Sequence, residues 1–153
     1  MEDLIETVTG GHVTAVKVVL ASVVLALAGY QAILMAVGYG WLRPRFLTAG
    51  SASAAHRVVG DVIVVLVLVV AAFCLGYYGI EDSPQDAAPG PEGRVTLHVV
   101  ASFALLGVLA LKLVVLHLWH RAARFLPLLG LTVLFLLFVS WFSSAGAFLL
   151  GPG

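Results

Sequence analysis

Charged residues are scarce in this sequence. They make up 10% of its 153 residues, against roughly a quarter in an ordinary soluble domain. Hydrophobic residues make up 61%, more than a soluble fold of this length would carry. The formal net charge is zero, and basic clusters interleaved with aromatic residues are missing. We therefore exclude a nucleic-acid-binding protein, for which such clusters are the usual signature.

Cysteine and the common catalytic motifs are also lacking. The single cysteine, Cys74, lies within an apolar run, so one chain forms neither a disulfide bond nor a cysteine-only metal site. The sequence contains no nucleophile motif, phosphate-binding loop or pair of catalytic carboxylates. Hydrolase and kinase functions therefore have no support.

A cleavable signal peptide is not expected either. The first apolar run is preceded by Glu2, Asp3 and Glu6, whereas a signal peptide begins with positive charge. The run is also longer than the apolar region of a signal peptide. We interpret it as a retained transmembrane helix.

Four long apolar runs dominate what is present. Each exceeds the roughly 18–20 residues that a helix needs to cross about 30 Å of hydrocarbon. We predict an all-α fold, an integral membrane four-helix up-down bundle that forms one transmembrane domain over residues 1–153 and is embedded in lipid. The predicted helices cover about residues 13–39, 58–80, 95–119 and 125–150.

The distribution of arginine predicts the orientation in the membrane. Loops rich in lysine and arginine stay in the cytoplasm. The opposite side holds only Arg94 next to its acidic loop and acidic amino tail. We expect a multi-pass protein of the plasma (inner) membrane with both termini outside the cytoplasm. The arginines that predict this orientation flank the first and third connections and are Arg43, Arg45, Arg57, Arg121 and Arg124.

Histidines are the residues best suited to bind a cofactor. All five lie near the ends of predicted helices: His12 and His98 on the outer side, and His56, His117 and His120 on the cytoplasmic side. A six-coordinate b-type haem needs two imidazoles from facing helices at equal depth. The pattern therefore predicts one or two haem b groups.

The depth of each histidine selects the predicted ligand pairs. On the cytoplasmic side His56 faces either His117 or His120. His120 lies nearer the face of His98, but His117 is a turn deeper and better shielded from water, so we favour His117. On the outer side we pair His12 with His98. The predicted iron ligands are thus His56, His117, His98 and His12, with His120 as the alternative.

Two further features belong to this predicted site. Gly60 follows His56 by one turn on the same helix face, where a missing side chain leaves room for the macrocycle. Asp61 and Lys112 lie deep in the second and third predicted helices at the same depth. Because a lone charge at that depth is costly, we predict that they form an ion pair.

The stretch from about His56 to Trp141 also carries a family resemblance. It contains HRVVGD, VVAAFC, RVTLH with a lysine beyond it, LPLLG, and a tryptophan followed by serines. In these segments it resembles a family of small four-span bacterial membrane proteins, itself similar to ferric-reductase-like and ascorbate-reducible b-type cytochromes. The resemblance implies a haem-bearing electron-transfer bundle. The chain departs from that family at Phe73, where a histidine often stands, and His12 takes over as the partner of His98.

We therefore expect a membrane-embedded b-type cytochrome that transfers electrons within or across the membrane. It would work as a haem-containing oxidoreductase or as an electron-transfer subunit, with a quinol or a redox protein as its partner. One alternative is a haem-free structural subunit of a larger membrane complex. A less favoured one is a small proton or ion transporter that uses Asp61 and Lys112 as a relay.

Overall fold

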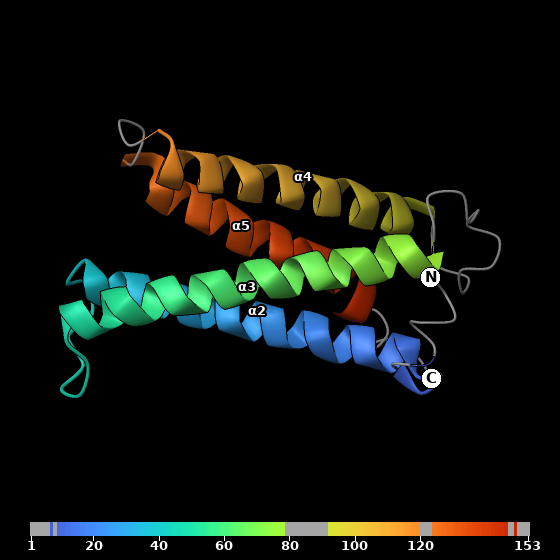
Figure 1. Ribbon diagram of the computed structural model, residues 1–153, viewed down its shortest axis with the longest axis horizontal. Coiled ribbons are helices and arrows are strands. Elements are labelled where there is room, and N and C mark those ends of the chain that lie inside the picture. The colour runs from blue at the N-terminus through green and yellow to red at the C-terminus, as the bar shows by residue number, and fades with distance from the viewer. Residues whose placement is uncertain (1–6, 8, 79–91, 120–123, 147–148, 150–153) are drawn as a thin grey trace.

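The chain folds into four long helices without strands in the part that the structure describes. The computed structural model describes residues 7, 9–78, 92–119, 124–146 and 149. All four helices are long and apolar enough to cross a membrane, so the predicted all-α four-helix bundle is confirmed (Figure 1). The helices are α2 (Val13–Gly38), α3 (Ala49–Tyr78), α4 (Glu92–His117) and α5 (Leu126–Trp141), which continues as a π-helical turn, η2 (Phe142–Gly146).

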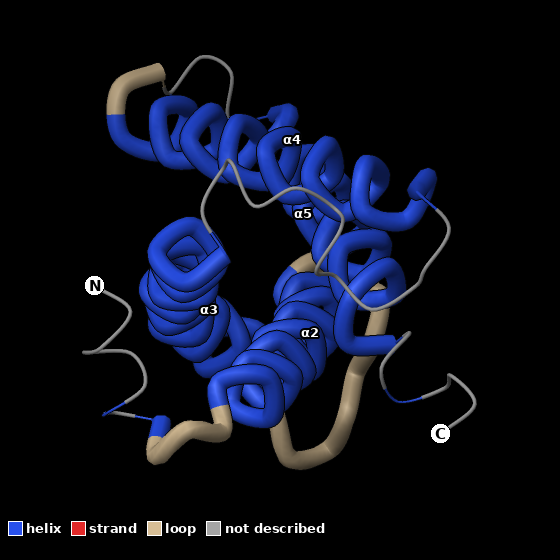
Figure 2. Tube along the Cα trace, turned by 90° about the vertical axis from the view of Figure 1, so that its right-hand side faces the viewer, coloured by secondary structure: helices blue, strands red, loops and turns tan. Residues whose placement is uncertain are grey.

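The helices alternate in direction and pack as two antiparallel pairs. α2 packs against α3, and α4 packs against α5 (Figure 1). The two pairs are joined mainly through α2, which also packs against α5 and η2. Within the described residues no comparable packing joins α3 to α4, and the end-on view shows α3 beside α2 and apart from α4 (Figure 2). Among the described residues, the closest backbone packing between the two pairs is therefore through α2 and α5.

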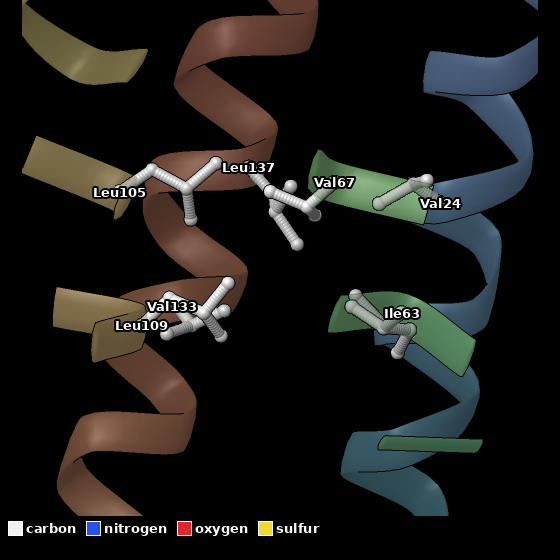
Figure 3. Packing of buried hydrophobic residues seen from close by; sticks show 8 residues of the cluster. Val24, Ile63, Val67, Leu105, Leu109, Val133 and Leu137 are labelled. Atoms are coloured by element: carbon white, nitrogen blue, oxygen red, sulfur yellow. The ribbon is translucent and has the colours of Figure 1, made fainter. Parts of the chain in front are cut away.

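A cluster of buried aliphatic side chains lies in the middle of the bundle. Every helix contributes two residues spaced by four, because that spacing places both on one helix face. Figure 3 draws the eight side chains, seven of them labelled, and the labelled ones lie in two layers, one above the other. Gln31 and Ser143, which are polar and buried, lie toward the two ends of this cluster. Its members are Val24, Ala28, Ile63, Val67, Leu105, Leu109, Val133 and Leu137.

The second membrane helix begins earlier than the sequence predicted. The prediction placed its start at about residue 58, whereas α3 begins at Ala49. Thr48 and Ser51 cap this end reciprocally: the Ser51 amide donates to Thr48 Oγ1 at 3.2 Å, and the Thr48 amide donates to Ser51 Oγ at 3.1 Å. Such caps satisfy helix amides that have no partner within the helix. The first turns of α3 are rich in alanine, serine and glycine, which add little hydropathy and therefore hid the helix start.

Candidate functional site

The first polar cluster lies where the beginning of α3 meets α2. His56 is half-buried, and its Nδ1 donates to the backbone oxygen of Gln31 at 3.3 Å. Gln31 is itself buried, and its Nε2 donates back to the backbone oxygen of His56 at 2.7 Å. A carbonyl oxygen accepts only, so Nδ1 carries the proton and Nε2 presents a lone pair. No hydrogen bond to Nε2 is found among the described residues.

Gly60 serves this cluster in a different way from the one predicted. A Cβ atom at Gly60 would lie 2.9 Å from Gln31 Nε2, closer than real Cβ contacts. The missing side chain therefore makes room for the Gln31 amide, which reaches past Gly60 to the backbone of His56. The Gln31 amide thus lies in the space that was predicted to receive a macrocycle.

The predicted ion pair between Asp61 and Lys112 does not form. Asp61 is exposed, whereas Lys112 is half-buried, and the structure records no ion pair between these two described residues. Asp61 follows His56 by five positions, which places it about 140° around the helix from His56 at 100° per residue. Lys112 instead lies within electrostatic range of His56. The two charges have equal depth but lie on different faces of the bundle.

The second polar cluster surrounds His98 at the opposite end of the bundle. Its Nδ1 donates to the backbone oxygen of Ser140 on α5 at 3.0 Å. The hydroxyls of Ser140 and Ser143 lie 3.4 Å from the same nitrogen, and the hydroxyls of Ser102 and Ser140 lie 3.0 Å apart. As at His56, a carbonyl acceptor fixes the proton on Nδ1, so Nε2 presents a lone pair.

The π-helical turn η2 explains why the Ser140 carbonyl can accept this bond. A π-turn shifts the backbone bonds from i+4 to i+5 and leaves a carbonyl open to other donors, and such turns are frequent at functional sites. Ser143 Oγ and Ser144 Oγ also donate to the Ser140 oxygen, at 3.1 and 2.8 Å. Trp141 Nε1 donates to Ser22 Oγ on α2 at 2.9 Å. The turn therefore connects α2, α4 and α5 around His98.

The two clusters have the same arrangement of histidine, backbone carbonyl and lysine. In each, a histidine donates to a backbone carbonyl of its own helix pair: His56 on α3 bonds to α2, and His98 on α4 bonds to α5. A half-buried lysine from the other pair lies within electrostatic range, Lys112 of α4 at His56 and Lys17 of α2 at His98. Since α3 and α4 start at opposite ends of the bundle, each end holds one oriented imidazole beside one cation (Figure 1).

His12 and His117 lie at helix ends and are exposed. His12 is the N-cap residue of α2, and Nδ1 of His117 donates to the Leu113 oxygen of its own helix at 3.0 Å. His120 lies outside the described residues. The partners that the structure records for His56 and His98 are Gln31 and Ser140, and none of the predicted second ligands is among them. Within the described part of the chain, no group of three or more acidic, histidine or cysteine side chains could hold a metal ion.

Sequence reasoning missed several residues of these clusters. Gln31 could have been found from the sequence, because a glutamine within a long apolar run must find a hydrogen-bonding partner inside the bundle. Lys17 was not among the predicted site residues, although it lies within electrostatic range of His98. The roles of Ser140 and Ser143 depend on the π-turn, for which the sequence carries no recognisable pattern.

Comparison with known proteins identifies the family but adds no activity. Residues 4–153 match the family model of DUF6529, a family of unknown function. The chain belongs to this family. No curated protein and no solved structure matches it. Because the DUF6529 match includes all four helices and both polar clusters, the function has to be argued from the geometry of those clusters.

Proposed function

We propose that this DUF6529 protein is a membrane-embedded b-type cytochrome that transfers electrons within or across the membrane. His56 and His98 would each ligate a haem b iron through Nε2, at opposite ends of the bundle. The observation that carries the proposal is that both interior histidines donate Nδ1–H to a backbone carbonyl of another helix. Metal-ligating histidines usually have this second bond, which fixes the ring orientation and increases the basicity of the coordinating nitrogen.

The donor set fits haem iron in its chemistry. Neutral imidazole is a common axial ligand, and an apolar helical bundle is a common setting for it. His56 and His98 are half-buried in such a bundle. A bound haem would supply one-electron chemistry, while the chain would supply ligands, orientation and charge. Lys112 and Lys17 place one positive charge near each histidine, which would attract the carboxylates of the cofactor.

The second axial ligand in each site stays as predicted from the sequence. It would be His117 or His120 on the cytoplasmic side and His12 on the outer side. One hydrogen bond supports His117 as the second ligand. Its Nδ1 donates to the Leu113 backbone oxygen, so its Nε2 also presents a lone pair. The sequence resemblance to ferric-reductase-like and ascorbate-reducible b-type cytochromes points to the same cofactor.

The location and the partner are part of the proposal. The excess of arginine around the first and third connections favours the plasma (inner) membrane with both termini outside the cytoplasm. A quinol in the bilayer or a redox protein at its surface would then deliver or accept electrons. Such a chain would act alone or as one subunit of a larger membrane complex.

A haem-free structural subunit is the second candidate, and one observation favours it. The reciprocal bonds between Gln31 and His56 join α2 to α3, which is a complete structural role for a histidine inside a membrane bundle. In that case His56 would matter for stability only. The two candidates therefore predict different spectra for the purified protein.

Haem content tests the proposal directly. We expect protein purified from haem-replete cells to show a Soret band and sharp bands in the reduced state. Replacing His56 by Ala should remove one haem, and replacing His98 by Ala should remove the other. Haem added together with imidazole should restore the low-spin spectrum in each variant, because imidazole can occupy the vacated axial position. Colourless wild-type protein with intact helical structure would leave the structural subunit as the function.

Replacing Gln31 by Ala provides the matched control. It removes the hydrogen bond to the His56 backbone but keeps the imidazole. If His56 is a ligand, this variant should keep a haem that the His56 variant loses. If His56 only joins helices, the two variants should lose similar stability and neither should differ from wild type in its spectrum.

A further inference from the structure

Asp61 is an exposed acidic residue on a membrane-spanning helix. It lies on α3 about 9 Å along the helix axis from Val67, a residue in one of the two central layers of the core (Figure 3). Half of a hydrocarbon core is about 15 Å thick, so the carboxylate lies at hydrocarbon depth. Among the described residues it forms no ion pair. Acidic side chains at this depth are rare and are normally paired, which indicates a partner outside this chain.

A row of exposed residues runs along α3 through Asp61. Alternating steps of four and three residues place the row on one face, the spacing of a coiled-coil seam. Asp61 lies about 160° around the helix from Val59, which packs toward α2, so the row faces away from the bundle. Ala54 and Ala72 are small enough to allow a second helix to approach closely. We call this row the α3 seam; its residues, all exposed, are Ala54, Val58, Asp61, Val65, Leu68, Ala72 and Leu75.

Arg57 beside the seam makes this face complementary to itself. It is exposed and lies one turn before Asp61, about 40° away around the helix. Helical side chains lean toward the helix N-terminus, so the Asp61 carboxylate extends toward the level of Arg57. Within one helix this order of cation and anion is the less favourable one, and no ion pair between the two is found in the described chain.

Two copies in one bilayer have the same orientation, so their α3 helices run parallel. A two-fold axis along the membrane normal then gives an isologous interface, in which each patch meets its own equivalent. Arg57 of each copy would lie opposite Asp61 of the other. We propose that the α3 seam is a homodimer interface, held together by two reciprocal Arg57–Asp61 ion pairs. The inference does not depend on the cofactor.

Charge reversal tests the interface. Asp61→Arg makes the patch wholly positive and Arg57→Asp makes it wholly negative, so we expect each variant alone to dimerise at least tenfold more weakly than wild type. The two variants co-expressed with different tags should form a heterodimer. The measurement is the dimer fraction in liposomes, by single-molecule photobleaching and by tag capture. Arg94→Asp, which reverses an exposed charge on α4, is the matched control and should remain dimeric.

Several results would overturn the proposal. Wild-type protein that stays monomeric in liposomes at every protein-to-lipid ratio would do so. Equal dimerisation of both single variants and wild type would also do so. Recovery of pairing in the mixture rules out misfolding of the variants, because a misfolded chain would not regain its partner. Failure of the mixture to pair, with both variants helical and monomeric, would exclude the reciprocal ion pairs.

Cross-linking provides an independent measurement. In a Cys74→Ala background, Val65→Cys on the α3 seam should form an intermolecular disulfide on mild oxidation. Val100→Cys on α4, similarly exposed at 61% against 60% for Val65, should not. Equal cross-linking at both positions would indicate random collision and would contradict a specific α3 interface.

Discussion

The orientation of His56 depends on the small volume of one glycine. The Gln31 amide nitrogen that bonds to the His56 backbone lies only 2.9 Å from where a Cβ atom at Gly60 would be, and the same packing brings His56 Nδ1 to the Gln31 carbonyl. The sequence placed His56 and Gly60 on one helix face correctly, since that follows from helical periodicity. It could not show that Gln31 from another helix fills the space, because this depends on how α2 and α3 pack.

Replacing Gly60 by Ala should therefore break the hydrogen bond between Gln31 and the His56 backbone. We expect the free energy of unfolding to fall by about 1 kcal/mol, the scale of an interhelical hydrogen bond in a membrane. In a Gln31→Ala background the same substitution should no longer destabilise. Reversible unfolding in mixed micelles measures this double-mutant cycle.

Gly29→Ala is the control for this prediction. Gly29 lies within α2, and a Cβ atom there would meet nothing within 4 Å. Alanine is the better helix former, so this substitution should be neutral or slightly stabilising. Equal losses at Gly29 and Gly60 would contradict the role assigned to Gly60.

The indole of Trp141 should contribute measurably to stability. Its Nε1 donates to Ser22 Oγ at 2.9 Å and connects α5 to α2. We expect Trp141→Phe and Ser22→Ala to be coupled by about 0.6–1.7 kcal/mol, as measured for such bonds between membrane helices. Additive losses in the double variant would show that the bond contributes nothing in the folded protein.

At the scale of helices, the predicted element types were right and the local irregularities were missed. Long apolar runs fix the number and approximate extent of membrane helices, because the bilayer requires every backbone group to be bonded within the helix. The start of α3 at Ala49 was missed because a capping interaction, and not hydropathy, sets it. The π-turn after Trp141 was missed because packing around His98 and α2 stabilises it.

Equal depth was also mistaken for proximity. Asp61 and Lys112 were paired because they lie level in the membrane, but helical periodicity alone places Asp61 far around α3 from His56. Counting the angle as well as the depth would have separated the exposed Asp61 from the half-buried Lys112. Sequence reasoning therefore placed Asp61 and Lys112 at the right depth but paired them wrongly.

The contact between α2 and α3 should depend on Leu34, which is 0% exposed. It packs with Val37 and Ala52 in a small cluster between these helices. We expect Leu34→Ala to lower the free energy of unfolding by about 2–5 kcal/mol through the cavity it leaves. The neighbouring Ile33, 52% exposed, is the control, and Ile33→Ala should cost far less. The same unfolding assay would refute the assignment if the two losses were equal.

At the scale of the whole molecule, the orientation in the membrane can be measured. In a Cys74→Ala background, an impermeant thiol reagent added to intact cells should modify a cysteine at Ala87 but not one at Phe46. Phe46, 90% exposed in the connection between α2 and α3, belongs to an arginine-rich loop that should stay in the cytoplasm. Ala87 lies outside the described residues, in the acidic loop. The reverse labelling pattern would mean that the protein is inserted upside down.

The packing of α2 with α3 and of α4 with α5 has a consequence for synthesis. Each pair consists of helices that are consecutive in the chain, so the first pair can insert and close before the ribosome has finished the second. Joining the two pairs through α2 and α5 is then a separate, later step, as in the two-stage folding of membrane proteins. A gene split within the connection between α3 and α4 should therefore yield two fragments that reassemble in the membrane, and tag capture of one by the other would detect this.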